Sequence, residues 1–375
     1  MEFNWWSVTV ACASILLGSY AFVFKILRKL NGWYYEFMLG KKQYPLPPGD
    51  MGWPLVGNLF AFTKAFKSED PDSFVNNLVS RYGIGGIYKV HLFGVLPSSY
   101  ARRRWSELLT NSSIEEHKWL RRLTTAPIVG HNRLAVYFDC IEDIIINSVE
   151  EWASMNEPIE LLNELKEVSF KIIIRIFLGF NNDSTIATVA YLFSIVKDAV
   201  MSFPVNVPGR KEEIIKTRPS SLKRLNLKDI KQMTYLAKVI DETLRKTNLL
   251  FGMFREAKAD VNINGYVKPK GWKVLSFARA VHLDPQYHLN PQQFNPSRWD
   301  DYNVKTSSFF PFGIGSRLCP GMDLGKLEIS IFLHYFLLNY KLERVDPECP
   351  ITCFPAPKPT DNCLTKVVKV TYHST

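Results

Sequence analysis

Residues 309–321 read FFPFGIGSRLCPG, and this stretch decides how the rest of the chain is interpreted. It places one cysteine, Cys319, among three glycines, with an arginine two positions before it and an apolar helical pattern after it. A thiolate is a soft ligand that suits iron, and glycine lets a backbone approach a flat surface closely. The positive end of the following helix favours the ionised thiol. The stretch therefore predicts a thiolate ligand for an iron held in a flat macrocycle.

The spacing around the cysteine is F-x-x-G-x-R-x-C-x-G. It is filled by Phe312, Gly315, Arg317, Cys319 and Gly321. This pattern resembles the haem-binding loop of a cytochrome P450, and the resemblance implies haem b with Cys319 as the iron ligand. It also implies that Phe312 covers one haem face and that Arg317 meets a haem carboxylate. Gly313 and Gly321 would let the backbone come close. The alternative is a structural cysteine in a glycine-rich loop, which five matched positions at fixed spacing disfavour.

A charged pair upstream of the loop supports the same family. Glu242 and Arg245 are three positions apart and so lie on one face of a helix. They resemble the E-x-x-R pair of cytochromes P450, and Arg298, in FNPSRW, stands where the third member is expected. The resemblance implies a charge-assisted network that holds the loop beneath the haem. Alone, an E-x-x-R pair is an ordinary surface ion pair.

Three further positions match weaker marks of the family. Arg255 resembles the strand arginine that meets a haem propionate. His117 and Arg121 are four positions apart on a helical face, and they resemble the family's W-x-x-x-R pair with histidine in the first place. For each residue, the alternative is a solvated basic side chain.

The N-terminal residues 1–30 are predicted to be a membrane anchor. No charged residue occurs from Trp5 to Phe24, and about twenty apolar positions span the hydrocarbon core as a helix. Basic residues follow this run, which places the body in the cytosol. A cleaved signal peptide is the alternative, but it would have a basic start and a small-residue cleavage site. With the family resemblance, this predicts a single-pass protein of the endoplasmic reticulum membrane that contacts lipid.

Residues 31–60 are predicted to form a proline-rich hinge, because YPLPPGDMGWPLVGN resists both helix and central strand. The remainder, 61–375, is the predicted haem-thiolate domain. Its periodicity predicts a mainly α fold with small β-sheets. Helices are expected over 134–155, 160–180, 226–244 and 324–343, short strands over 260–282, a loop over 291–303 and a strand at the end of the tail. Asn226 is expected to cap its helix, with Asp229 in the first turn.

The composition excludes some classes of function. Of the 375 residues, 46% are hydrophobic and the net charge is +10. A basic balance can indicate nucleic acid, an anionic membrane or an acidic partner, but no zinc-finger spacing or basic repeat is present. We therefore expect no nucleic-acid partner. The six cysteines include no CxxC pair, which favours a reducing compartment.

One family feature is absent from the sequence. Cytochromes P450 carry a central helix with an [AG]-G-x-[DE]-T motif, and no such motif occurs between Ile172 and Glu242. Residues 95–109 also look abbreviated. The expected fold is therefore an incomplete cytochrome P450 fold with internal segments missing. Without the central helix, the haem face opposite the sulfur would open to solvent, and an apolar substrate would lack an enclosed pocket.

The sequences of three segments resemble one plant branch of the family, which contains the ent-kaurenoic acid oxidases and the β-amyrin 11-oxidases. These segments are GWYYEFMLGKKQYPLPPGDMGWPLVG, DLGKLEISIFLHYFL and KPTDNCLTKVVKV. The resemblance implies a monooxygenase that oxidises an apolar triterpenoid such as β-amyrin, with NADPH and dioxygen as co-substrates through NADPH–cytochrome P450 reductase. Three alternatives stay open: an ent-kaurenoic acid oxidase, a truncated inactive relative, and a membrane-anchored interaction protein.

Overall fold

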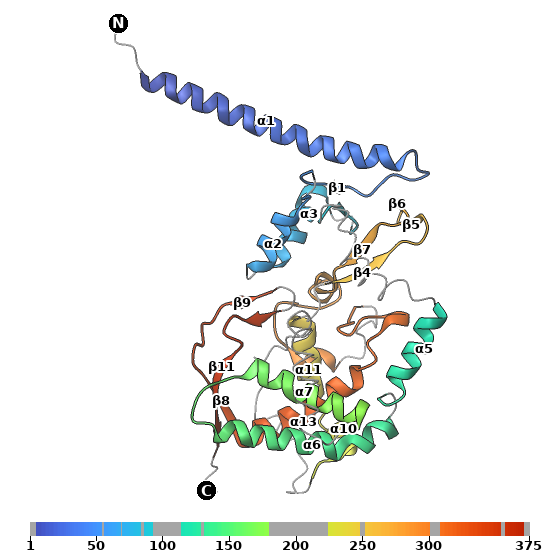
Figure 1. Cartoon of the computed structure of the whole chain (residues 1–375), viewed down its shortest axis with the longest axis vertical. Coiled ribbons are helices and arrows are strands. Elements are labelled where there is room, and N and C mark those ends of the chain that lie inside the picture. Colours follow the sequence, from blue (N-terminus) through green and yellow to red (C-terminus); the bar gives the residue numbers. More distant parts are fainter. Residues whose placement is uncertain are drawn as a thin grey trace. The chain divides into compact units, whose positions relative to one another are not determined.

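The computed structural model describes residues 5–54, 56–68, 70–83, 86–92, 114–128, 131–179, 224–247, 252–300, 308–353 and 357–370. The chain divides into two compact units. The smaller consists of Met1–Leu108 and Phe254–Leu275, and the larger of Leu109–Met253 and Ser276–Thr375. Figure 1 labels the elements of both units.

The smaller unit begins with the long helix α1. Its helices are α1 (Trp5–Leu39), α2 (Leu59–Lys67) and α3 (Asp72–Tyr82). Its strands form three two-stranded pairs: β1 (Gly49–Asp50) with β2 (Lys89–Val90), β4 (Met253–Glu256) with β7 (Lys273–Ser276), and β5 (Val261–Ile263) with β6 (Tyr266–Lys268). Phe62, Phe66 and Phe74 pack together between α2 and α3.

The predicted anchor is helical, since α1 contains residues 5–24. Most of the side chains in that range lie outside the described set. Within the described residues, no helix is both long and apolar enough to cross a membrane. The first part of the segment predicted as a hinge, 31–39, is helical, because α1 continues to Leu39. From α1, Asn31 donates from its amide to the carbonyls of Met51 and Gly52, at 2.9 and 3.2 Å.

The larger unit is mainly helical. Its helices are α5 (Ile114–Thr125), α6 (His131–Ser154), α7 (Leu161–Leu178), α10 (Leu227–Gln232), α11 (Thr234–Thr247), α12 (Ala278–His282) and α13 (Met322–Asn339). Two short 3-10 turns are η1 (Pro296–Trp299) and η2 (Gly315–Arg317). One sheet has the order β3 (Ile159–Glu160), β11 (Leu364–Lys369), β8 (Tyr340–Arg344), and β9 (Ile351–Thr352) pairs with β10 (Lys358–Pro359).

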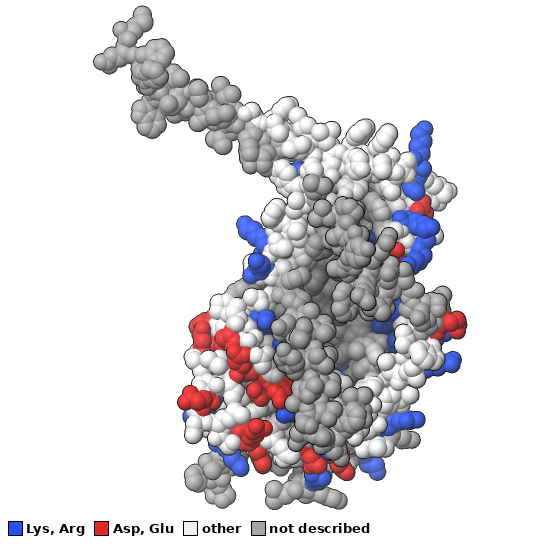
Figure 2. Space-filling view, viewed as in Figure 1, with Lys and Arg blue, Asp and Glu red and all other residues white. Residues whose placement is uncertain are grey.

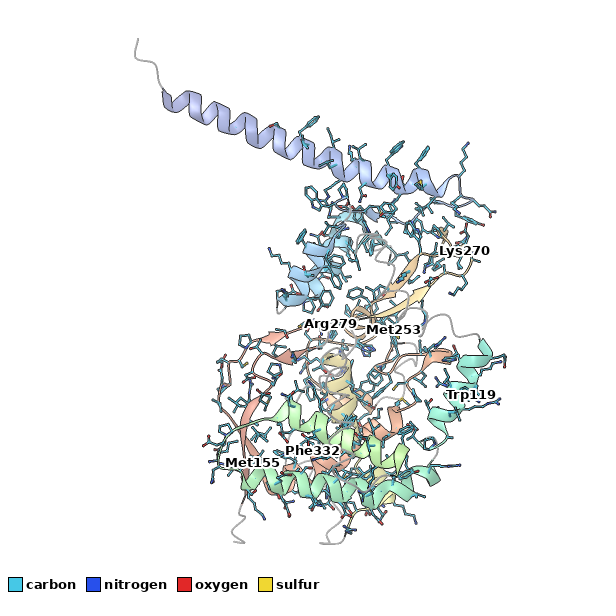
Figure 3. All side chains as sticks on the ribbon, viewed as in Figure 1. Trp119, Met155, Met253, Lys270, Arg279 and Phe332 are labelled. Carbon is cyan, nitrogen blue, oxygen red and sulfur yellow. The ribbon has the colours of Figure 1, made fainter. Side chains whose placement is uncertain are left out.

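The core of the larger unit lies between α6, α7, α11 and α13. Ile141, Leu236 and Ile331, one from each of three of these helices, are completely buried. Phe332, labelled in Figure 3, packs against this core, with its ring centre 6.3 Å from that of Trp152. By contrast, Trp119 on α5 is largely exposed. The apolar core positions α13, which directly follows the cysteine loop.

The predicted helices at 134–155 and 160–180 are confirmed by α6 and α7. The predicted Asn226 cap is also confirmed, because its side chain accepts from the backbone of Lys228 and Asp229 in a full capping box. The strands expected between 260 and 276 and at the end of the tail are present as β5, β6, β7 and β11.

Four element predictions were wrong in detail. The helix expected over 226–244 is two helices, α10 and α11, because the backbone leaves the helical region at Met233. Residues 278–282, expected as strand, form α12, and part of the loop expected over 291–303 forms η1. The helix expected to reach 343 ends at Asn339, since Tyr340–Arg344 joins the sheet beside β11. The segment 180–223, where the central motif was sought, and 95–109 lie outside the described residues.

Candidate functional site

The cysteine loop is a tight structure closed by its own backbone. The Cys319 N–H donates to the Phe312 carbonyl at 2.9 Å, and the Leu318 N–H donates to the Gly315 carbonyl at 3.0 Å. At the start of the loop, the Gly313 N–H donates to the Phe310 carbonyl at 2.9 Å. These bonds fix the position of the cysteine relative to the phenylalanines that precede it.

Two glycines of the loop have backbone conformations that other residues rarely adopt. Gly313 has φ +84° and Gly315 has φ +74°, both in the left-handed region. A Cβ at Gly313 would meet the Met253 Sδ at 3.4 Å, whereas a Cβ at Gly315 would meet no atom within 4 Å. The two glycines are therefore required for the turn itself, and not chiefly to avoid a clash.

The thiol is free and exposed. Cys319 lies three residues before α13, and Gly321 occupies the position before that helix. A Cβ at Gly321 would lie 3.9 Å from the Cys319 Sγ, so the sulfur lies beside the entrance to α13. Phe312 is half-buried and packs against the core, which anchors the other side of the loop.

The structure brings Glu242, Arg245 and Arg298 together in a buried network. Arg245 donates to both carboxylate oxygens of Glu242, at 2.8 and 2.9 Å. Nε of Arg298 lies 3.0 Å from each of the same oxygens. The Asn295 backbone and the Trp299 indole N–H also donate to this carboxylate. The side chains of Glu242 and Arg245 are fully buried and that of Arg298 is 8% exposed.

The network keeps Glu242 ionised. Burial would raise the pKa of Glu242, but the hydrogen bonds from Arg245, the Asn295 backbone and Arg298 outweigh it and lower the pKa. The two arginines also donate outward to backbone carbonyls, Arg245 to His282 at 2.7 Å and Arg298 to Leu289 at 2.8 Å. The network therefore holds the chain between α12 and η1 as well as its own three members.

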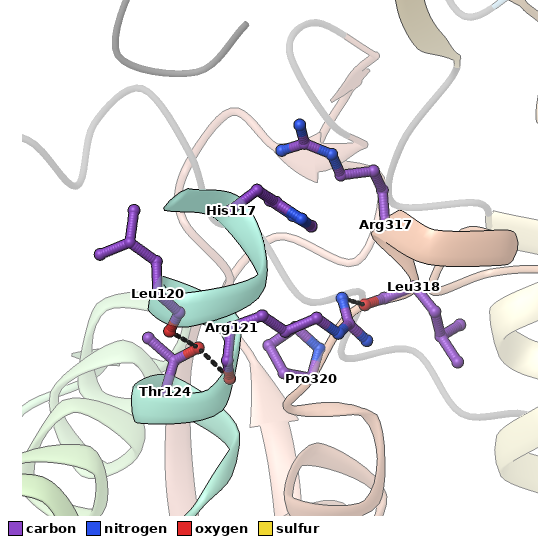
Figure 4. Close-up of a pocket in the computed structure, with 7 residues that line it drawn as sticks. All are labelled: His117, Leu120, Arg121, Thr124, Arg317, Leu318 and Pro320. Atoms are coloured by element: carbon purple, nitrogen blue, oxygen red, sulfur yellow. Dashed lines mark hydrogen bonds between the residues drawn. The ribbon is translucent and has the colours of Figure 1, made fainter. Parts of the chain in front are cut away.

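The structure also brings His117, Arg121 and Arg317 together. They line a hollow of about 230 Å³ between α5 and the cysteine loop (Figure 4). Leu120, Thr124, Leu318 and Pro320 complete the lining. Arg121 donates from Nη1 to the Leu318 carbonyl at 2.9 Å and to the Ser316 carbonyl at 3.1 Å. Its side chain therefore ties α5 to the loop.

This hollow has the charge that carboxylate groups need. Partial desolvation, with the positive charges of Arg317 and Arg121, lowers the pKa of His117. The exposed thiol, the left-handed glycine loop and the cationic hollow beside it together supply the groups that haem binding needs: one sulfur for the iron and cations for the propionates. The residues present fit the group.

Arg255 belongs to the smaller unit, on β4. Its role toward a haem propionate stays a prediction. The roles of the other residues toward haem also stay predictions, although the positions of His117, Arg121 and Arg317 agree with them.

Two functional candidates were missed in the sequence. His282 and His288 are buried, and each contacts the backbone at the start of the cysteine segment. The only signal was their place in HLDPQYH, between the E-x-x-R helix and FNPSRW. A histidine in such a segment gives no indication of its partner.

The thiol loop, the buried network and the cationic hollow define a haem-thiolate protein. The cytochrome P450 family model matches residues 210–365. The chain is 43% identical to β-amyrin 11-oxidase from Glycyrrhiza uralensis, over 99% of each chain. It is 39% identical to (1S)-1-hydroxy-luvungin A synthase from Citrus sinensis, over 98% of this chain and 99% of the relative. Ent-kaurenoic acid oxidase 1 from Arabidopsis thaliana is 35% identical, over 91% and 94%. The chain therefore belongs to the cytochrome P450 family.

A solved structure shows the same fold. Retinoic acid-bound cyanobacterial CYP120A1 matches with a TM-score of 0.67, over 88% of this chain and 100% of that chain, at 19% sequence identity. The protein is a cytochrome P450 monooxygenase, an oxidoreductase of the plant branch that was expected. Membership of the family implies haem iron as the cofactor, with NADPH and dioxygen as co-substrates through a reductase.

Proposed function

We propose that this monooxygenase oxidises a triterpenoid of the β-amyrin type. The observation that carries the proposal is the 43% identity to β-amyrin 11-oxidase across 99% of both chains, together with the Cys319 loop. An 11-oxidase turns a ring methylene into a ketone, which requires repeated oxidation at one carbon. The substrate is then a large apolar polycycle, and its terpenoid class agrees with the other relatives.

In this proposal the chain's own residues hold the cofactor. Cys319 would bind the haem iron through its sulfur, and the backbone bonds of the loop would keep the sulfur in place. His117, Arg121 and Arg317 would pair with the propionates in the cationic hollow. The Glu242 network would hold the loop from the side of η1. The haem iron, when bound, supplies the activation of dioxygen that oxygen insertion needs.

Two exposed basic side chains of the larger unit support docking of an acidic reductase. Lys118 and Arg122 are exposed on α5, the helix that also carries His117 and Arg121. Acidic side chains are exposed at the end of α6, at Glu150 and Glu151, and Figure 2 shows acidic side chains along one edge of this unit; on α5, Glu115 pairs with Lys118 at 2.9 Å. Complementary charge mainly raises the rate of encounter between partners. We therefore place the reductase on the α5 side.

We further propose that residues 5–24 anchor the protein in the endoplasmic reticulum membrane with its body in the cytosol. The uncharged run and the basic residues after it support this. A fluorescent fusion that distributed evenly through the cytosol, and that carbonate washing did not leave in the membrane pellet, would overturn the proposal.

Two other functions stay in contention. The identity to ent-kaurenoic acid oxidases makes ent-kaurenoic acid the second candidate substrate. A chain without activity is the third candidate. The alignment with β-amyrin 11-oxidase extends over 493 positions whereas this chain has 375 residues, so the relative contains residues with no counterpart here. This difference supports the proposal that internal segments are missing.

The first prediction concerns the thiol. Purified protein reconstituted with hemin, reduced and exposed to carbon monoxide should show the red-shifted Soret band of a thiolate ligand. Cys319→Ser should lose this band, since a hydroxyl does not replace a thiolate. Cys353→Ser is the matched control and should keep the band. A band that persisted in Cys319→Ser would refute the haem assignment.

Turnover then separates the three functions. Membranes with the protein and a reductase are supplied with β-amyrin or with ent-kaurenoic acid, and oxidised products are followed by mass spectrometry. Oxidation of β-amyrin alone supports the proposal, and oxidation of ent-kaurenoic acid alone supports the second candidate. A thiolate spectrum without either product supports an inactive chain.

A further inference from the structure

Two buried histidines contact the backbone that leads into the cysteine loop. His282, at the end of α12, is 0% exposed, and its Nε2 lies 3.0 Å from the Phe310 backbone nitrogen. His288 is 2% exposed, and its Nε2 lies 3.1 Å from the Ser308 carbonyl oxygen. The two rings therefore bind backbone groups of Ser308 and Phe310, two residues apart in the sequence and next to the loop.

The partners decide which nitrogen of each ring carries a proton. A backbone N–H can only donate, so Nε2 of His282 must accept and the proton of a neutral ring lies on Nδ1. A carbonyl can only accept, so Nε2 of His288 must donate. The two histidines thus take opposite tautomers. Neither Nδ1 atom has a hydrogen-bond partner in the described part of the chain, so the Nε2 contacts are the polar contacts that hold the rings.

His282 is at the same time attached to the charged network. Its backbone carbonyl accepts from Arg245 at 2.7 Å, while its ring accepts from Phe310. The path then continues along the backbone, because the Phe310 carbonyl accepts from Gly313 and the Phe312 carbonyl accepts from Cys319. A series of hydrogen bonds between 2.7 and 3.0 Å leads from the Glu242 network to the backbone of the thiol residue.

Ring packing supports the same connection. The His282 ring lies 5.0 Å from that of Phe310, edge to face, and 5.5 Å from that of Phe309. Phe309 in turn packs at 4.5 Å against Trp299, whose indole N–H donates to Glu242. The histidine therefore contacts the start of the loop through one hydrogen bond and two aromatic rings.

The surroundings keep His282 in the form that can accept. Burial, with His288 and Arg245 nearby, lowers the pKa of His282 to about 4. Burial also lowers the pKa of His288. At neutral pH the His282 ring is uncharged, so Nε2 retains its lone pair.

We propose that His282 is a positioning residue for the haem-thiolate loop: by accepting the Phe310 N–H it couples the Glu242–Arg245–Arg298 network to the backbone that places the Cys319 sulfur. The consequence for iron binding rests on the proposed role of Cys319. The coupling itself does not, because every contact in it joins two protein groups.

The experiment therefore has two readouts. The first is hydrogen exchange of the Phe310 amide, measured without added haem. The second is the fraction of protein with the thiolate Soret band after hemin reconstitution, reduction and carbon monoxide. In His282→Leu, which has no acceptor, Phe310 exchange should become about fivefold faster, the factor that corresponds to one neutral hydrogen bond. The thiolate fraction should fall in the same variant.

Two amide variants test the geometry and serve if His282→Leu does not fold. In His282→Gln the amide oxygen reaches about as far as Nε2 and should restore slow Phe310 exchange and most of the thiolate band. In His282→Asn it reaches only about as far as Nδ1 and should restore neither. A purely structural role would not separate these variants. His334→Leu, which removes another buried histidine, on α13, is the control and should leave Phe310 exchange unchanged.

Each result decides a separate claim. Wild-type Phe310 exchange in folded His282→Leu, or equal behaviour of His282→Gln and His282→Asn, would overturn the coupling. Fast Phe310 exchange with an undiminished thiolate band would refute the claim that His282 positions the Cys319 sulfur. A wild-type protein that never shows the thiolate band would refute the haem proposal instead, and Phe310 exchange would still test the coupling.

Discussion

The backbone angles of single residues decide whether the cysteine loop can form. Gly315 and Gly321 both belong to the family pattern, but glycine is needed at the two positions for different reasons. Gly315 has φ +74° with open space around it, whereas Gly321 has φ −87° and only ordinary contact with the Cys319 Sγ. The first is required by backbone conformation, and the second by the close approach expected of a flat ligand.

This difference gives a stability prediction. Gly315→Ala should lower the free energy of unfolding by about 1–2 kcal/mol, because an L-residue is forced into the left-handed region. Gly321→Ala should change it by less than about 0.5 kcal/mol in the protein without haem. Urea unfolding measures both. Equal destabilisation by the two variants would contradict this reading of the loop.

At the scale of elements, α11, α12 and η1 are joined through one carboxylate. Glu242 on α11 accepts from Arg298 on η1, and Arg245 donates to the end of α12. A buried ion pair contributes less than its Coulomb attraction suggests, because both charges lose hydration. Removing one partner is different, because it leaves the other charge buried and uncompensated.

Glu242→Gln should therefore lower the free energy of unfolding by about 3–5 kcal/mol. The matched control is Glu343→Gln on β8, where the carboxylate pairs with Lys341 at 2.6 Å and both side chains are more than half exposed. That change should alter the free energy by less than about 1 kcal/mol. Thermal or urea unfolding tests the pair. A similar loss of unfolding free energy in both variants would show that the buried Glu242 network contributes no more stability than an exposed ion pair.

The sequence predicted the elements that local chemistry controls. The Asn226 capping box and the helices α6 and α7 follow from side chains that act on their own segment. The pattern around Cys319 predicted the loop, because its glycine conformations are also local. The E-x-x-R spacing indicated the network, although burial of Arg245 is a property of the packed fold.

Tertiary contacts account for what the sequence did not predict. Tyr340–Arg344 reads as the end of an apolar helix, but pairing with β11 makes it a strand. The break at Met233 has no proline or glycine to mark it. The roles of His282 and His288 depend on backbone groups at 310 and 308, which are 28 and 20 residues away, and no local pattern specifies such a partner.

At the scale of the whole molecule, acid should destabilise the protein before its carboxylates titrate. The pKa of His282 falls from 6.5 to about 4 on folding, so between these values the unfolded chain binds a proton that the folded chain does not. Stability therefore falls as the pH drops through this range, by up to about 3 kcal/mol for His282. His288 acts in the same direction, and Glu242, whose pKa is lowered, adds its own loss only below about pH 4.5.

His282→Gln removes this titration, so the slope of unfolding free energy against pH should be shallower in the variant between about pH 6.5 and pH 5. Urea unfolding at a series of pH values, with His334→Leu as the control, measures the difference. Identical slopes in wild type and His282→Gln would show that the imidazole protonates freely in the native state.

The hydrogen bonds from Arg121 to the carbonyls of Ser316 and Leu318 should affect the rate at which hemin binds. Because the Arg121 guanidinium binds these two carbonyls through protein groups alone, little rearrangement of α5 and the loop should be needed when hemin binds. Hemin should then associate at a rate set mainly by diffusion and orientation. In Arg121→Ala, α5 and the loop must come together as hemin binds. The fast single-phase association of hemin should therefore become slower in this variant.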